Sequence, residues 1–93
     1  MIQAKLVVAG DVHGVSYRAF CKQTALPLGL TGYAKNKRDG TVEVMVCGKE
    51  DAIAEFEKTL KTTTPGMARV DSVKLISKTA CMQQAEGFRI ISE

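Results

Sequence analysis

The fold is decided by the stretch Asn36-Lys37-Arg38-Asp39-Gly40-Thr41-Val42-Glu43-Val44-Met45-Val46. Its last six residues place apolar side chains at every second position, which is the pattern of a strand with one buried face. The Asp39-Gly40 pair before them favours the positive φ angles of a tight turn. Because residues 30–35 are also rich in strand-forming side chains, we expect an antiparallel hairpin that turns at residues 36–40.

A helix is expected on each side of this hairpin. Residues 16–28 repeat apolar side chains at spacings of one, three and four, and Gly29 is a natural stop signal. Pro27 removes a backbone donor in the last turn, so this helix should kink there or end early. Residues 50–61 carry one apolar face and form the second helix.

Three more strands complete the pattern: residues 2–9, residues 70–76, whose register the pattern does not fix, and residues 87–91 after a polar connection at 79–86. The two helices and the first four strands follow the order βαββαβ, which predicts an α+β, ferredoxin-like sandwich, with an antiparallel sheet and both helices on one face. We expect residues 1–93 to form a single domain. Many unrelated activities share this arrangement, so it does not name a function.

Composition restricts the class of protein. The net charge of +3 is too small to diagnose a nucleic-acid-binding protein, and it slightly favours small anionic partners. No apolar run approaches the roughly 18 residues of a membrane span, so no membrane partner is expected. Residues 1–10 read as a strand and lack the profile of a signal peptide, so we expect a cytoplasmic protein.

The three cysteines, Cys21, Cys47 and Cys81, lie far apart and form no C-x-x-C pair. A four-ligand zinc site would require all three to converge with His13, the single histidine, and structural zinc ligands usually show close spacing. We therefore expect small, apolar packing residues. A disulfide is the remaining alternative, and the sequence leaves open which pair would form it.

The chemistry is expected in the segment Gly10-Asp11-Val12-His13-Gly14-Val15-Ser16-Tyr17-Arg18, which runs from a strand through a glycine loop into a helix. The glycines let successive backbone N–H groups converge on an anion, and the helix start adds free donors. Arg18 can hold a phosphate through two parallel hydrogen bonds. Taken alone, the segment also fits an ordinary turn, just as Asn36 alone fits a turn-starting asparagine.

Together, these segments resemble the two signatures of the acylphosphatase family, G-x-V-Q-G-V-x-[FY]-R and G-[FYW]-x-K-N-x-x-x-G-x-V-x-x-x-x-x-G. Residues 10–18 and 32–48 agree at every specified position, except that His13 replaces the common Gln. Ala68-Arg69-Val70 and Gly87-Phe88 are also similar to the family. The resemblance therefore covers essentially the whole chain.

The resemblance implies hydrolysis of carboxyl-phosphate mixed anhydrides to a carboxylate and phosphate, without a metal or organic cofactor. By motif position, Arg18 is expected to bind the phosphate and Asn36 to orient the attacking water. Backbone N–H groups of six loop residues would bind the phosphate oxygens: Val12, His13, Gly14, Val15, Ser16 and Tyr17. A monomer is the simplest expectation, and the physiological acyl phosphate is left open.

The roles of two loop residues and two other classes of protein offer alternatives to this interpretation. His13 resembles a catalytic base, yet the family position is usually Gln, so we favour a packing or hydrogen-bonding role. Asp11 would oppose an anion unless its carboxylate points to solvent. A non-catalytic anion-binding module would keep the loop without needing Asn36. An RNA-binding domain would display aromatic side chains on central strands, and residues 41–46 contain none.

Overall fold

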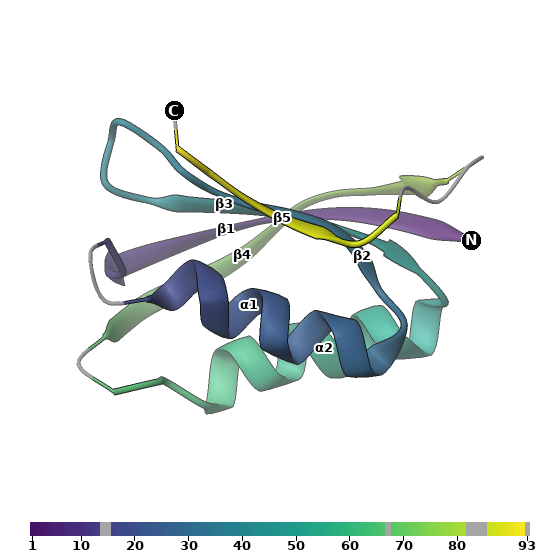
Figure 1. The fold of residues 1–93 in the computed structure, drawn as a ribbon, viewed down its shortest axis with the longest axis horizontal. Helices are drawn as coiled ribbons and strands as arrows, with labels where there is room; N and C mark the ends of the chain where they lie inside the picture. The colour runs from purple at the N-terminus through teal and green to yellow at the C-terminus, as the bar shows by residue number, and fades with distance from the viewer. Residues whose placement is uncertain (14–15, 67, 82–85, 93) are drawn as a thin grey trace.

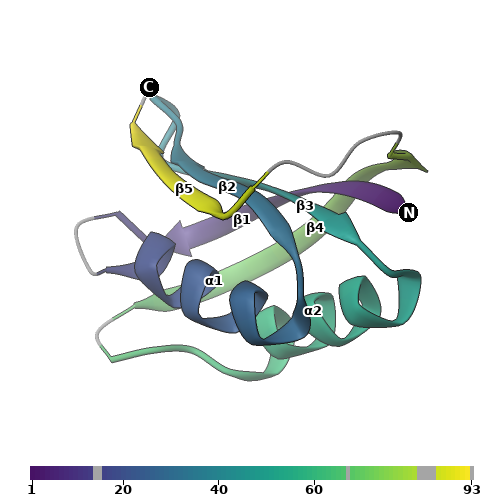
Figure 2. The same ribbon diagram turned by 45° about the vertical axis from the view of Figure 1, so that its right-hand side comes forward.

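The computed structural model describes residues 1–13, 16–66, 68–81 and 86–92. Its elements are β1 (Ile2–Asp11), α1 (Tyr17–Ala25), the 3-10 turn η1 (Leu26–Leu28), β2 (Thr31–Asn36), β3 (Val42–Gly48), α2 (Glu50–Thr62), β4 (Arg69–Ala80) and β5 (Phe88–Ser92). The strands form one sheet in the order β4-β1-β3-β2-β5. Both helices lie on the same face of this sheet (Figure 1 and Figure 2), which confirms the expected ferredoxin-like α+β sandwich.

The expectation of a wholly antiparallel sheet is wrong at one edge. β1 pairs antiparallel with β3 and β4, and β2 pairs antiparallel with β3, but β5 runs parallel to β2. The path of the chain explains the difference. β4 ends where β1 begins, since Ala80 is opposite Ile2, and β5 then starts at the far edge of the sheet beside the first residues of β2. The two neighbours therefore run in the same direction.

The first helix ends early, as the position of Pro27 predicts. The α-helical part stops at Ala25, Pro27 lies inside the 3-10 turn, and Gly29 closes the turn with a φ of 75°. Proline cannot donate the next helical hydrogen bond, and glycine adopts a positive φ at little cost. The second helix lies where it is expected and is one residue longer, ending at Thr62.

The fourth strand is longer than expected, because it pairs with β1 from end to end. Two register shifts, between Lys5 and Leu6 and between Ala9 and Gly10, place one extra residue on β4 each time. Each bulge reverses which side chains face the core, so no single alternation runs through residues 69–80. This explains why the sequence pattern did not fix the register of this strand.

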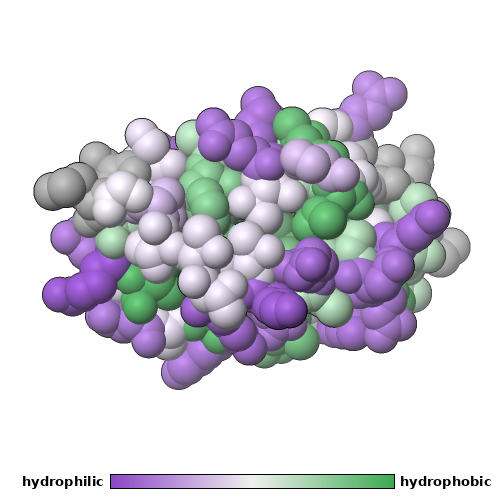
Figure 3. All heavy atoms as spheres, turned by 90° about the horizontal axis from the view of Figure 1, so that it is seen from below, coloured by the Kyte–Doolittle hydropathy of each residue, from purple (hydrophilic) through white to green (hydrophobic). Residues whose placement is uncertain are grey.

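The core lies between the sheet and the helices. Its residues are fully or almost fully buried and come from every layer, among them Leu6, Val8, Tyr17, Cys21, Leu30, Val42, Val44, Val46, Phe56 and Leu60. The helix side of the surface is mostly hydrophilic, with scattered apolar residues (Figure 3). Within the described residues, no helix is both long and apolar enough to cross a membrane.

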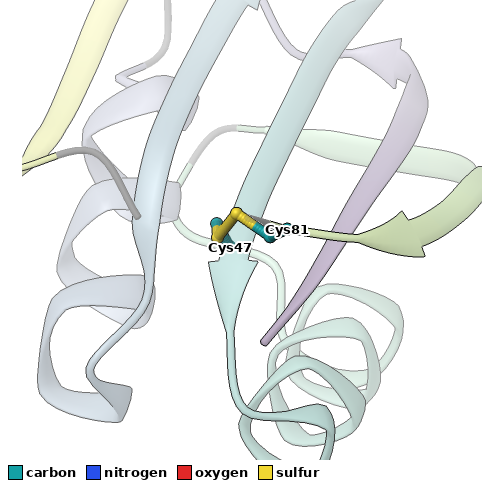
Figure 4. Close-up of a disulfide and its surroundings, with 2 residues drawn as sticks. All are labelled: Cys47 and Cys81. Carbon is teal, nitrogen blue, oxygen red and sulfur yellow. A yellow bond between two sulfur atoms is a disulfide. The ribbon is translucent and has the colours of Figure 1, made fainter. Parts of the chain in front are cut away.

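A disulfide joins Cys47, near the end of β3, to Cys81, just beyond β4 (Figure 4). The two Cα atoms are 6.5 Å apart, and the Cys81 N–H donates to the Met1 carbonyl at 2.9 Å. The bond therefore bridges the two neighbours of β1 at the end of the sheet where β1 starts. Only Cys21 packs as a small apolar residue in the way we expected, and burial raises the pKa of its thiol to about 12.

Candidate active site

The segments singled out in the sequence meet at the end of the sheet away from the disulfide. β1, β2 and β5 all finish there, at Asp11, Asn36 and Ser92, and α1 begins there. Figure 1 shows the end of β1, the start of α1, the β2–β3 hairpin and the end of β5 on the same side of the molecule. Residues more than 70 positions apart in sequence therefore become neighbours.

Arg18 lies in the first turn of α1 and reaches β5. Its Nη1 donates to the Ile91 carbonyl at 2.8 Å and to the Ser92 hydroxyl at 2.9 Å. Arg18 also lines a hollow of about 360 Å³, whose described lining consists of Val12, Ser16, Tyr17, Arg18, Ala19 and Ile90. The residue expected to bind phosphate therefore lies at an open site and is held at one nitrogen.

The start of α1 complements negative charge. Ser16 adopts a left-handed conformation, with a φ of 61°, and within the described part of the chain its side chain makes no capping bond. The first turn, residues 17–20, carries no acidic side chain. The N–H of Phe20 bonds to the Ser16 carbonyl at 3.1 Å, whereas the N–H groups of residues 17–19 have no acceptor within the helix. These groups and the positive end of the helix dipole thus favour an anion at the start of α1.

Two of the loop residues expected to bind phosphate have side chains that pack in the core. Val12 and Tyr17 are almost completely buried, so only their backbone groups are candidates for binding. Burial, together with the nearby Cys21, raises the pKa of the Tyr17 hydroxyl, which makes no hydrogen bond to the described residues. Gly14 and Val15, also expected to bind phosphate, lie outside the described residues.

His13 contacts the hairpin. Its Nε2 donates to the Thr41 carbonyl at 2.8 Å, which ties the loop after β1 to the first residue after the β2–β3 turn. This is the kind of contact that a hydrogen-bonding role predicts. Asp11 is exposed at the end of β1, which is the arrangement an anion site beside it requires.

Asn36 is the last residue of β2 and pairs with Val42 on one side and Ser92 on the other. Asn36 as a whole is half-buried, but its Oδ1 atom is fully buried and has no hydrogen-bond partner among the described residues. A buried acceptor without a partner costs about 1–3 kcal/mol, so such an atom calls for a donor. Asn36 thus has an unused acceptor beside the strand that holds Arg18.

Ser92 connects the two signature residues and was missed by the sequence analysis. Its hydroxyl accepts from Arg18, and its backbone lies beside Asn36 in parallel register. A single serine after a short strand carries no recognisable pattern. The contact depends on the parallel β2–β5 pairing, which the sequence did not predict either.

Two signature glycines let neighbouring strands approach closely, Gly10 at the site end of the sheet and Gly32 near the disulfide end. Gly10 has a φ of 138°, and a Cβ there would overlap the β4 backbone at Arg69; Gly32 has a φ of 147°, and a Cβ there would overlap the Met45 carbonyl. Both positions thus combine a positive φ with close approach of a neighbouring backbone, which only glycine permits. These parts of the signatures serve packing.

Among the residues that the structure describes, no three His, Cys, Asp or Glu side chains gather as ligands for a metal ion. The zinc site weighed from the sequence needed Cys47 and Cys81 as thiolates, and their sulfurs are bonded to each other. The cysteines therefore serve packing and cross-linking.

Comparison with known proteins finds close relatives of the whole chain. The family model described as Acylphosphatase matches residues 4–90. An acylphosphatase of Aliivibrio fischeri is 51% identical over 67 residues, covering 72% of this chain and 73% of the relative. An acylphosphatase of Vibrio vulnificus is 42% identical over 87 residues, covering 94% and 93%. The crystal structure of acylphosphatase from Bacillus subtilis superposes with a TM-score of 0.88 at 30% identity, covering 97% and 98%.

Proposed function

The chain belongs to the acylphosphatase family and is an enzyme that hydrolyses acyl phosphates to a carboxylate and inorganic phosphate; we propose that Arg18 binds the phosphate and Asn36 orients the attacking water. One observation carries this assignment: Arg18 bonds to Ser92, and Ser92 lies directly beside Asn36. A phosphate-binding cation and a water-binding amide are thereby brought to the same end of the sheet.

Binding of the phosphate rests on Arg18 and the loop before α1. Arg18 lines an open hollow, and the start of α1 offers the N–H groups of residues 17–19, which have no acceptor within the helix, with no acidic side chain in its first turn. Negative charge spreads over three equatorial oxygens in the loose transition state of phosphoryl transfer. Donors fixed in advance around these oxygens stabilise that charge without reorganising.

Orientation of the water rests on the Asn36 amide. Its Oδ1 is buried and lacks a partner among the described residues, so the amide has to turn toward the open end of the sheet before a hydrogen of the attacking water can satisfy this acceptor. The amide nitrogen supplies donors at the same time, so the group can fix a water in two directions. Holding a nucleophile in an attack geometry removes much of the entropy cost of the reaction.

The reaction needs little more from the protein. A carboxylate is a good leaving group, so no general acid is required for its departure. We assign no protein base: His13 Nε2 bonds to Thr41, and burial raises the pKa of both the Tyr17 hydroxyl and the Cys21 thiol, to about 12 for Cys21. We propose that an oxygen of the substrate phosphate accepts the water proton.

Hydrolysis of benzoyl phosphate in the presence of a chelator tests the assignment of Arg18. Arg18→Ala should lower kcat/KM by a factor of about 10²–10³, or roughly 3–4 kcal/mol, the cost of losing a donor to a transition-state oxyanion. Arg18→Lys should not restore activity, because an ammonium lacks the two parallel donors. Arg89→Ala, an exposed arginine on β5, is the matched control and should keep wild-type activity.

Two results would contradict the proposal. Wild-type turnover by Arg18→Ala would show that this guanidinium does not hold the reacting phosphate. Binding of inorganic phosphate by the wild type without release of phosphate from benzoyl phosphate would instead identify a non-catalytic anion-binding module.

A further inference from the structure

We propose that Ser92 is a positioning residue for catalysis. Its hydroxyl fixes which edge of the Arg18 guanidinium faces the phosphate and how far that edge lies from Asn36. The inference rests on the proposed roles of Arg18 and Asn36 and adds a residue that neither signature contains. Its basis is the pair of hydrogen bonds from Arg18 to β5 and the place of Ser92 in the sheet.

The first step concerns the donors of Arg18. A guanidinium has five N–H donors in one plane, two on each Nη and one on Nε. The two hydrogens of Nη1 are taken by the Ile91 carbonyl and the Ser92 hydroxyl, at 2.8 and 2.9 Å. Within the described residues, Nε and Nη2 make no hydrogen bond, so the edge that they form is the part of the guanidinium left for a ligand, and its two N–H groups are parallel.

The second step concerns orientation. One hydrogen bond to the Ile91 carbonyl would hold Nη1 but allow the plane of the guanidinium to tilt about that contact. The second acceptor, the Ser92 hydroxyl, fixes the plane. Bidentate binding of phosphate requires both donors to lie in the plane of two oxygens, so a fixed plane favours the two-bond geometry over a single contact.

The third step concerns spacing. Ser92 lies opposite Asn36 in parallel register, and neighbouring strands are about 4.8 Å apart. The hydroxyl that orients the phosphate-binding residue is thus carried by the strand that flanks the water-binding residue. Misplacement of reacting groups by about 1 Å can cost 10²-fold in rate, so this link affects catalysis as well as binding.

The test compares Ser92→Val with Ser92→Thr, because the two replacements have the same shape and only threonine keeps the hydroxyl. Ser92→Val should lower kcat/KM for benzoyl phosphate about tenfold, because a hydrogen bond to a charged group is lost. The inhibition constant of inorganic phosphate should rise by a similar factor. Ser92→Thr should keep most of the activity. Ser77→Val, at an exposed position on β4, is the control for introducing valine into a strand.

A second comparison shows whether Ser92 acts through Arg18. In the Arg18→Ala background, the change from Ser92 to Val should have no further effect on single-turnover rate, because the group that it positions is gone. Thermal midpoints of the Val and Thr variants should agree within about 2 °C, which separates positioning from stability.

Equal activity of the Val and Thr variants would overturn the inference, and so would a tenfold loss that persists in the Arg18→Ala background. If Arg18→Ala itself kept full activity, the proposed function would fail instead. Loss of activity in Arg18→Ala together with no effect of Ser92→Val would refute the role of Ser92 and leave Arg18 in place.

Discussion

The two ends of the sheet differ in how their polar and cross-linking groups are used. At the disulfide end, Cys47 is bonded to Cys81, and Lys78 forms an ion pair with Glu50 at 2.9 Å. At the site end, the guanidinium of Arg18 is held by one nitrogen only and the Oδ1 of Asn36 has no partner among the described residues. Cross-links join β4 to β3 and to α2 where nothing is expected to bind, whereas the Arg18 guanidinium and the Asn36 acceptor keep unused hydrogen-bonding capacity where a phosphate and a water are proposed. The Thr31 hydroxyl, a buried group without a described partner at the disulfide end, is the exception.

This contrast indicates that stability and catalysis are carried by different ends of the same strands. A change at the disulfide end should alter the free energy of unfolding and leave the folded enzyme active. A change at the site end should alter turnover and leave stability nearly constant. Buried polar groups without partners are tolerated at functional sites because the ligand supplies the missing partner.

The largest effect on stability is expected from Cys81→Ser. The disulfide closes a loop with a sequence separation of 34, and the chain-entropy model assigns such a loop roughly 4 kcal/mol. The free energy of unfolding in urea should fall by about 3–4 kcal/mol, while kcat/KM of the folded variant at 25 °C should stay within about twofold of wild type.

Wild-type enzyme treated with a reductant is the control for the serine replacement, and it should match Cys81→Ser in both measurements. Disulfides are rare in the cytosol, so our expectation of a cytoplasmic protein requires an enzyme that works with both thiols free. Loss of turnover in the folded, reduced enzyme would show that the two ends of the sheet are coupled.

Asn36→Ala should lower turnover and leave stability nearly unchanged, which is the opposite of the result expected for Cys81→Ser. Turnover should fall by about 10²-fold, or roughly 3 kcal/mol, because the water loses the group that aims it. The inhibition constant for inorganic phosphate should change by less than about threefold, and the free energy of unfolding by less than about 1 kcal/mol, since an unsatisfied acceptor is removed. A parallel loss of phosphate affinity would place Asn36 at the phosphate instead of the water.

A smaller effect is expected at His13. Replacement by Gln keeps a donor for the Thr41 carbonyl, so activity and stability should both stay near wild type. His13→Leu removes the bond between the loop and the hairpin and should cost about 1 kcal/mol of stability, measured by urea unfolding. A loss of turnover in His13→Gln greater than tenfold would instead support a role for the imidazole in proton transfer.

The smallest effect concerns Thr31, at the disulfide end, whose buried hydroxyl also has no partner among the described residues. Thr31→Val replaces the hydroxyl by a methyl group of similar size in a strand, so the free energy of unfolding should rise by up to about 1 kcal/mol. Activity should not change, because Thr31 is five residues before Asn36 along β2. A decrease in stability would show that the hydroxyl has a partner in solution, such as a water.

The sequence predicted the local features of this molecule. Alternation in residues 41–46, the Asp39-Gly40 turn and the apolar face of residues 50–61 each act within a few positions, and each lies in the expected element. The candidate residues Arg18 and Asn36 were found through the signatures. Pro27 ended the first helix as its missing N–H requires.

The features that the sequence did not predict depend on contacts between distant segments. The parallel pairing of β5, the bond from Arg18 to Ser92 and the choice of Cys47 and Cys81 all follow from where the chain crosses the sheet. None of these leaves a periodic pattern, because each joins residues whose separation in sequence is not repeated. The register of β4 was not predicted either, because its two bulges interrupt the alternation of side chains that could have fixed it.

Titration of inorganic phosphate into isotope-labelled protein, followed residue by residue by NMR, tests the central claim most directly. The account predicts saturable shifts of the backbone amides of residues 12–18, the Arg18 Nε–H and the Asn36 side-chain amide, with no change around Cys47 and Ala80. Shifts that leave Arg18 and Asn36 unaffected, or that spread over exposed lysines without saturating, would contradict it.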